Sequence, residues 1–273
     1  MLTSLMADDA DSGAKTPDLS LAAGRDAPVE LLRRHLFTAP PPFLEGALDN
    51  PALTESEMVL LLRNMQATPK LLLAIGRDQR WTQSQEVKKL LVLHPRVPLI
   101  TARNILPHLF WKQLAEVAKS PHVNPVVRRR AEDSLKAKTE ELISGEKAAL
   151  ARQATPRLIE ALAKSGKSRV LRGLLENGRT REKDAAGIAA DDSLPGELLA
   201  FIANHHRWGA LRSIRLALLA NPRTPVPAAL QLLGRLAVRD LRRLASDDNV
   251  PKIVNMGAER RLQEMEQRRT RGE

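Results

Sequence analysis

Two arginine–tryptophan pairs are the residues of this sequence best suited to bind an anionic or flat ligand. Arg80 precedes Trp81, Arg207 precedes Trp208, and a 127-residue shift along the chain relates the two pairs. A guanidinium binds phosphate or carboxylate oxygens, and an indole can stack on a planar ring. The alternative is that each tryptophan is a core residue that seals a joint in the fold.

The 127-residue shift also relates other basic residues, so positive charge recurs at equivalent places. In a repeat protein such positions recur along one face, and a stripe of lysine and arginine can follow phosphate groups. The alternative is that these charges keep the surface soluble and stabilise helix ends. The candidate binding residues are four pairs: Arg80/Arg207, Lys88/Arg215, Arg96/Arg223 and Lys112/Arg239.

Residue patterns typical of catalysis or metal binding were not found in the sequence. The chain has no cysteine, and its six histidines lack His-x3-His or HExxH spacing. Glycine-rich phosphate loops and a Gly-x-Ser-x-Gly elbow are also missing. The sequence therefore predicts no metal site, no cofactor and no enzyme activity.

Short Thr-Pro and Asn-Pro motifs separate apolar segments of helical length. Threonine can cap the first turn of a helix, and proline in that turn has no amide to leave unpaired. A residue before proline is driven out of the helical region, so Asn-Pro ends a helix. We expect about fourteen helices, the longest over 123–143, and an all-α fold.

Residues 48–137 align without gaps on residues 175–264, and 22 of the 90 positions are identical. A shorter period lies within this one, because a 44-residue interval separates Asn50 from His94 and also Asn177 from Asn221. Helical pairs that recur every 40–47 residues are typical of HEAT and armadillo arrays. The sequence thus predicts two duplicated units joined by a degenerate middle repeat.

The Asn221-Pro222-Arg223-Thr224-Pro225 mark, set between helices rich in leucine and alanine, resembles leucine-rich-repeat-variant proteins and HEAT-like solenoids of bacteria. This resemblance covers about residues 48–266 and implies a right-handed α-solenoid. Some leucine-rich-repeat-variant proteins carry a cysteine-ligated cluster, which a chain without cysteine cannot hold. The residues expected to shape the turns and joints are Trp81, Trp208, Pro95, Pro222, Thr224 and Pro225.

Charge divides the chain into an acidic leader and a basic body. Residues 1–50 have a net charge of −4 and residues 51–273 a net charge of +15. The predicted domains are a disordered leader (1–27), an N-terminal capping helix (28–47) and the solenoid (48–268). The first residues make a poor signal peptide, and no apolar run reaches ~18 residues. We expect a cytoplasmic protein with no membrane insertion.

The predicted function is a non-enzymatic scaffold that binds a macromolecule, most readily a protein, through its concave or basic face. The alternative is nucleic-acid binding by the basic stripe. A third hypothesis, an alkylpurine DNA glycosylase, rests on the resemblance to HEAT-like glycosylases and on Asp78 near Trp81. The direction in which the tryptophans and arginines point would discriminate among these hypotheses.

Overall fold

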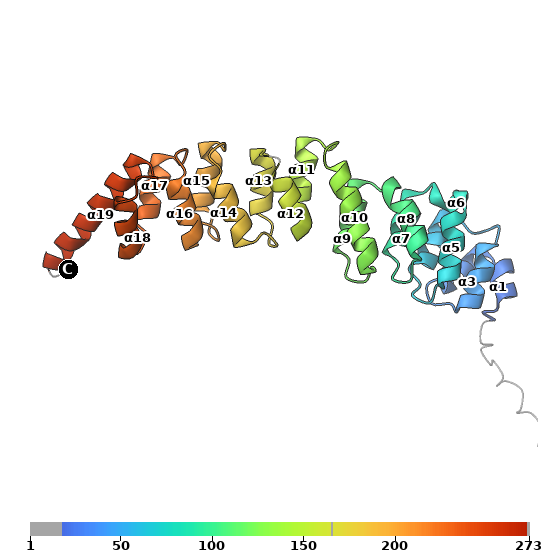
Figure 1. The fold of residues 1–273 in the computed structure, drawn as a ribbon. Helices are drawn as coiled ribbons and strands as arrows, with labels where there is room; N and C mark the ends of the chain where they lie inside the picture. The colour runs from blue at the N-terminus through green and yellow to red at the C-terminus, as the bar shows by residue number, and fades with distance from the viewer. Residues whose placement is uncertain (1–17, 165, 272–273) are drawn as a thin grey trace, which may run out of the picture. The chain divides into compact units, whose positions relative to one another are not determined.

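The computed structural model describes residues 18–164 and 166–271, and helices are the only regular elements in these ranges. The first helices are α1 Leu21–Asp26, α2 Val29–His35, α3 Pro41–Leu48, α4 Glu55–Leu62, α5 Pro69–Arg77, α6 Gln79–Thr82, α7 Gln85–Leu93, α8 Leu99–Ile105 with the 3-10 turn η1 Leu106–His108, and α9 Trp111–Lys119. The others are α10 Pro125–Lys138, α11 Ser144–Ala151, α12 Pro156–Ala163, α13 Ser168–Leu175, α14 Glu182–Ala190, α15 Gly196–Asn204, α16 Arg212–Ala220, α17 Val226–Leu233, α18 Val238–Ala245 and α19 Lys252–Arg271 (Figure 1).

The prediction of an all-α chain is confirmed for the described residues, whereas the number of helices was underestimated. Nineteen α-helices are present there. Most have only six to nine residues, which is about two helical turns, and short loops separate them. The longest is α19, with 20 residues, and the helix expected over 123–143 ends earlier, at Lys138. No helix in the described ranges is long and apolar enough to cross a bilayer.

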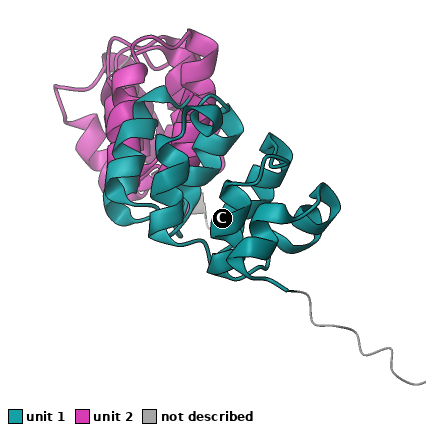
Figure 2. Ribbon diagram, turned by 90° about the vertical axis from the view of Figure 1, so that its right-hand side faces the viewer, with its two compact units in different colours: residues 1–109, 120–127 teal, residues 110–119, 128–273 magenta. Residues whose placement is uncertain are grey.

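Helices form two compact units, which Figure 2 shows in different colours. Unit 1 takes residues up to 109 together with 120–127, and unit 2 takes 110–119 together with 128–273. In unit 1, α1, α3, α5 and α8 pack one on the next, beside α2, α4 and α7. In unit 2, α11, α13, α15, α17 and α19 make one such row and α12, α14 and α16 make the other, while α18 packs on α19. This stacking of successive helices is that of an α-solenoid.

The N-terminal part of the chain differs from the predicted domains. The predicted leader includes α1, which is helical and packs on α3, so disorder is wrong for residues 21–26. A side chain at Gly24 would collide with the Phe43 carbonyl oxygen, at 2.2 Å, so glycine lets the two helices touch. The predicted single capping helix over 28–47 is two helices, α2 and α3, and residues 1–17 lie outside the described residues.

Buried asparagines hold successive turns together. The Nδ2 group of Asn50 donates to the carbonyl oxygens of Gly24 and Ala27, both at 2.9 Å. Asn177 does the same to Ala151 and Ala154, at 2.8 and 3.0 Å. The 127-residue shift relates each residue of the first set to one of the second. The bonds satisfy carbonyl groups at helix ends, which a buried helix terminus cannot leave unpaired.

The same device recurs at other turns. Asn64 donates to the carbonyls of Leu36 and Ala39, and Asn221 donates to those of Ala189 and Asp191, all at 2.9–3.0 Å. At His94 an imidazole replaces the amide. Its Nδ1 accepts from the amide of Arg96 at 3.1 Å, so its Nε2 donates to the Asn64 carbonyl, also at 3.1 Å. The turn residue is therefore an asparagine or a histidine with the same bonding role.

Helix starts follow the 127-residue shift beyond the aligned segments. Eight helices of the first half, α2 to α5 and α7 to α10, have start positions that this shift maps onto the starts of α12 to α19. One predicted start is misplaced: α17 begins at Val226, with Pro225 as its N-cap. The Thr224 hydroxyl does not cap this helix, because it donates to the Leu218 carbonyl at 2.6 Å and so secures the preceding turn.

Candidate functional site

Both tryptophans of the arginine–tryptophan pairs are buried. Trp81 is 6% exposed and Trp208 is fully buried, so neither indole presents a face to solvent. Trp208 Nε1 donates to the Leu175 carbonyl at 2.8 Å, and Trp81 Nε1 has no partner among the described residues. Guanidinium groups cover the rings, with Arg80 at 5.3 Å and Arg207 at 4.0 Å from the respective ring centroids. A ligand could reach the arginines but not the indoles.

Arg80 is held by its neighbour Asp78. Its Nη2 donates to Asp78 Oδ2 at 2.7 Å, and its backbone amide donates to Oδ1 at 2.9 Å. The hydrogen bonds from Arg80 hold the pKa of the Asp78 carboxyl below its ordinary value. This carboxylate caps α6 and pairs with Arg80. The glycosylase hypothesis stays a prediction.

The eight candidate basic residues are divided between the two units. Arg80, Lys88 and Arg96 belong to unit 1, whereas the other five, Lys112, Arg207, Arg215, Arg223 and Arg239, belong to unit 2. A single stripe through all eight therefore stays a prediction. Their structural roles also differ, because Arg215 bonds to backbone carbonyls while Arg96, Arg223 and Arg239 are exposed at the surface.

Within unit 2, arginines gather on three loops that each join one helical row to the other. The loops span 176–181, 205–211 and 234–237. Arg207 reaches the first loop, where its Nη2 donates to the Thr180 carbonyl at 2.7 Å. Arg215 joins the second and third loops by donating to the carbonyls of Ala210 (3.0 Å) and Arg235. These bonds make the three loops neighbours.

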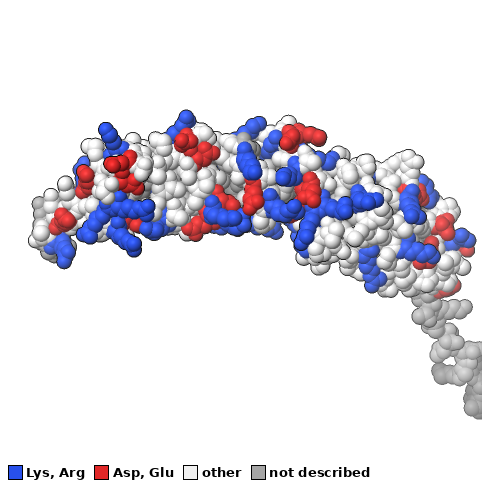
Figure 3. Space-filling model, viewed as in Figure 1, with Lys and Arg blue, Asp and Glu red and all other residues white. Residues whose placement is uncertain are grey.

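We name this surface the arginine edge. It comprises Arg179, Arg181, Arg207, Arg212, Arg215, Arg235 and Arg239. Figure 3 shows basic side chains gathered along the lower border of the surface that carries α16 and α18.

Some of these arginines are paired with acids and others are not. Arg181 bonds to Asp184 and Glu160 at 2.9 and 3.0 Å, and Arg212 bonds to Asp240 at 2.8 Å. The side chains of Arg179, Arg235 and Arg239 are exposed and have no hydrogen-bond or ion-pair partner in the part of the chain that the structure describes. The edge therefore keeps a positive charge available to a ligand.

A cluster of rings connects the arginine edge to the helices beneath it. The rings of Phe201 and His205 lie 5.5 Å apart, and those of His205 and His206 are stacked at 4.6 Å. His205 also lies 6.1 Å from Trp208, and the Arg172 guanidinium lies 4.2 Å from the Phe201 ring centroid. Burial, and then the charges of His206 and Arg207, lower the pKa of His205, so its ring is mainly neutral at pH 7.

The sequence pointed to only part of this cluster. The adjacent His205 and His206 stand out beside Arg207-Trp208, and their counterparts in the first half are Asp78 and Gln79. Phe201 and Arg172 belong to different helices, α15 and α13, and no local pattern joins them. Their counterparts are Ala74 and Glu45, so the ring cluster belongs to the second half alone.

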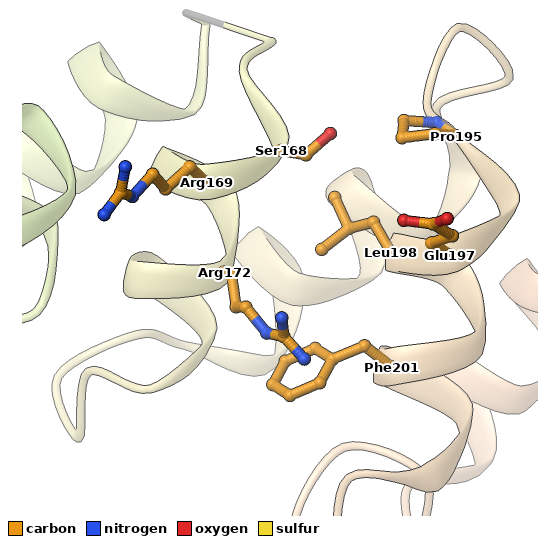
Figure 4. Close-up of a pocket in the computed structure, with 7 residues that line it drawn as sticks. All are labelled: Ser168, Arg169, Arg172, Pro195, Glu197, Leu198 and Phe201. Atoms are coloured by element: carbon orange, nitrogen blue, oxygen red, sulfur yellow. The ribbon is translucent and has the colours of Figure 1, made fainter. Parts of the chain in front are cut away.

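Next to the cluster is a pocket of about 250 Å³ between α13 and α15 (Figure 4). Leu198 and Phe201 provide apolar surface, and the Arg172 guanidinium lies against the Phe201 ring. The remaining lining residues are Ser168, Arg169, Pro195 and Glu197. The pocket combines an aromatic face, positive charge and one carboxylate. Among the described residues no group of three His, Asp or Glu side chains is placed to hold a metal ion.

Family models, curated proteins and solved structures were compared with this chain, and none matches.

Proposed function

We propose that this chain is a non-enzymatic, HEAT-like α-solenoid that binds nucleic acid through the arginine edge of unit 2. In this proposal a 127-residue unit was duplicated, and the second copy took on the binding role. The observation that carries the proposal is a set of three exposed, unpaired guanidinium groups, those of Arg179 and Arg235 on adjacent loops and that of Arg239 in the first turn of α18. Their counterparts in the first copy are Ala52, His108 and Lys112.

The charge of the chain supports this assignment. Residues 147–273 contain 24 basic and 14 acidic side chains, a net of +10, whereas residues 20–146 contain 18 and 14, a net of +4. Arginine suits phosphate because its planar fork donates two parallel hydrogen bonds. Arg207 and Arg215 are already fixed by backbone carbonyls, which lowers the entropy lost when a ligand orders the surface.

Charge reversal on the edge tests the proposal. The variant Arg179→Glu/Arg235→Glu/Arg239→Glu changes exposed residues only, so the fold should persist. Fluorescence anisotropy with a labelled 20-nucleotide strand should show at least a hundred-fold weaker binding at about 0.1 M salt. The salt slope of the wild-type protein should exceed that of the variant by about two, roughly 0.7 for each phosphate of the single strand that the variant no longer neutralises.

The matched control makes the same change of charge elsewhere. Arg34, Arg63 and Arg103 are exposed residues of unit 1 with no side-chain partner among the described residues. The variant Arg34→Glu/Arg63→Glu/Arg103→Glu should lose only a few-fold in affinity, through net charge alone. Equal losses in the two triple variants would show that the edge has no special role.

A protein partner is the second candidate, because apolar side chains are exposed at the end of unit 2. Val226 (45% exposed) and Leu230 (50%) on α17 lie near Ile253 (44%) and Met256 (66%) on α19. A groove of about 350 Å³ runs beside them, lined in part by Leu230 and Gly257. A specific partner captured by the wild type but lost by Leu230→Glu/Met256→Glu would favour this candidate.

A further inference from the structure

We propose that the pocket between α13 and α15 holds one unstacked base of a single-stranded nucleic acid whose phosphates lie on the arginine edge. This inference rests on the proposed function and names its ligand more closely. It assigns a role to Phe201, Arg172 and Glu197, which lie outside the edge itself.

Pocket and edge are continuous. Arg172 and Phe201 line the pocket, and Phe201 contacts His205 at the start of the 205–211 loop. His205 contacts Trp208, whose ring is covered by Arg207, a residue of the edge. A strand that places phosphates on Arg207 and Arg179 therefore passes beside the stacked rings of His205 and His206 before it reaches the pocket.

The lining of the pocket fits a base better than it fits an acidic side chain. Leu198 and Phe201 form the apolar side of the pocket, and a base can pack against them and stack on the Arg172 guanidinium that lies over the Phe201 ring. Glu197 is exposed, and its carboxylate has no hydrogen-bond or ion-pair partner among the described residues. It would repel an acidic peptide, whereas it can accept a hydrogen bond from the exocyclic amino group of a base. Cytosine should therefore bind better than thymine.

A paired base is excluded from this arrangement. In a duplex both faces of a base are stacked and its hydrogen-bonding edge is occupied, so only an unpaired base can enter the pocket. The equivalent surface of the first half has Glu45 and Ala74 in place of Arg172 and Phe201. That half should therefore provide no base-binding pocket.

Anisotropy titrations of the full chain with labelled oligo(dC), oligo(dT) and a dC·dG duplex of equal length test the inference. We expect the wild type to bind oligo(dC) about ten-fold or more tighter than the duplex, and tighter than oligo(dT). Phe201→Leu should weaken binding of both single strands about ten-fold and leave duplex binding unchanged. Glu197→Ala should remove the preference for oligo(dC) over oligo(dT).

Two exposed residues of unit 2 away from the pocket serve as controls. Phe110→Leu removes an exposed phenyl ring and Glu259→Ala removes an exposed carboxylate, and both should bind like the wild type. Thermal melting by circular dichroism shows whether each variant keeps the wild-type fold. Weaker binding by a variant with unchanged melting then reports on the ligand and not on folding.

The outcomes separate this inference from the proposed function. Equal affinity for single strand and duplex, unchanged by Phe201→Leu but abolished by charge reversal at the edge, would overturn the base pocket and keep the edge. Binding of polyglutamate with no binding of any oligonucleotide would overturn both proposals.

Discussion

The two halves of this chain, residues 20–146 and 147–273, share structural contacts and differ in charge. Arg25 pairs with Asp49 at 3.2 Å in the first half, and their counterparts Arg152 and Glu176 pair at 2.7 Å in the second. The hydrogen bonds from Asn50 and Asn177 to helix-end carbonyls also correspond between the two halves. The two halves thus share contacts that hold one helix on the next, while residues at many exposed positions differ.

One pair of neighbouring helices is joined by an ion pair in both halves, although the arginine lies at a different position in each half. Arg33 on α2 bonds to the buried Glu57 on α4 at 2.8 Å. In the second half the equivalent positions are both acidic, Glu160 and Asp184, and Arg181 bonds to both. The bridge between neighbouring helices survives because a buried carboxylate requires a partner, whichever helix supplies it.

The largest expected effect tests whether the asparagine turns are equivalent. Asn50→Ala and Asn177→Ala each leave two carbonyls and one amide without partners, which should cost about 2–4 kcal/mol. Hydrogen exchange should accelerate in α1–α3 for the first variant and in α11–α13 for the second. Asn249→Ala, at an exposed turn, is the control and should cost less than about 0.5 kcal/mol. Unequal losses of stability in Asn50→Ala and Asn177→Ala would show that the two turns are not equivalent.

A smaller effect is expected for an ion pair of the second half whose two positions are glutamines in the first half. Arg212 pairs with Asp240, whose side chain is 6% exposed, whereas the first half has Gln85 and Gln113 at these positions. Arg212→Gln should lower the free energy of unfolding at pH 7, because it leaves the Asp240 carboxylate without its partner. The double variant Arg212→Gln/Asp240→Gln should recover most of this loss.

The pH dependence of this pair has a definite sign. Hydrogen bonds from Arg212 hold the pKa of Asp240 below its ordinary value of 3.8. The pair therefore stabilises the fold above that value, and the stabilisation is lost as pH falls through the lower folded-state pKa. Denaturation at pH 7 and pH 3 should show the cost of Arg212→Gln shrinking at the lower pH. A cost that is the same at both would rule out the ion pair as its cause.

The smallest effect concerns His94, whose counterpart is Asn221. Burial is the main cause that lowers the pKa of His94 below 6.5, and the charge of Arg96 adds to it. The neutral ring is favoured in the fold, so stability should fall as pH drops below about 6.5, by at most about 1.4 kcal/mol per pH unit. The melting temperature of His94→Asn should change less than that of the wild type between pH 7.5 and 5.5.

A matched histidine variant separates His94 from the other titrating groups. His108 is exposed, so His108→Asn should keep the pH dependence of the wild type. If the melting temperatures of His94→Asn and His108→Asn change with pH by the same amount, protonation of His94 does not destabilise its turn.

Local patterns predicted much of the fold. Pro69 and Pro156 are the first residues of α5 and α12, as Thr-Pro predicts, because proline suits the first helical turn, where its missing amide leaves nothing unpaired. The Thr68 hydroxyl caps α5, whereas Thr155 makes no such bond to α12. The prediction for Thr224 was wrong, because its hydroxyl donates to the Leu218 carbonyl in the turn before it and does not accept from an amide of α17. Sequence spacing does not decide between a donor role toward the preceding turn and an acceptor role toward the following helix.

For the candidate site, the sequence selected residues whose charge is retained in both halves, whereas two of the three exposed, unpaired arginines of the edge have neither arginine nor lysine as their counterpart. Arg179 and Arg235 were not chosen, because Ala52 and His108 take their places in the first half. Arg215 was chosen, yet its guanidinium is used to join two loops. A comparison of equivalent positions selects residues that stabilise the fold, because the helices of the two halves pack in the same way.

By itself, the sequence determined the helical class, the 127-residue correspondence and the burial of apolar faces, because these follow from periodicity and local capping. Only the tertiary structure decided that Arg207 is bound to Thr180 while its neighbour Trp208 is closed to solvent. It also brought Arg172 onto Phe201, from separate helices, to line one pocket. Such contacts depend on how one helical row is laid on the next, which no short stretch of sequence specifies.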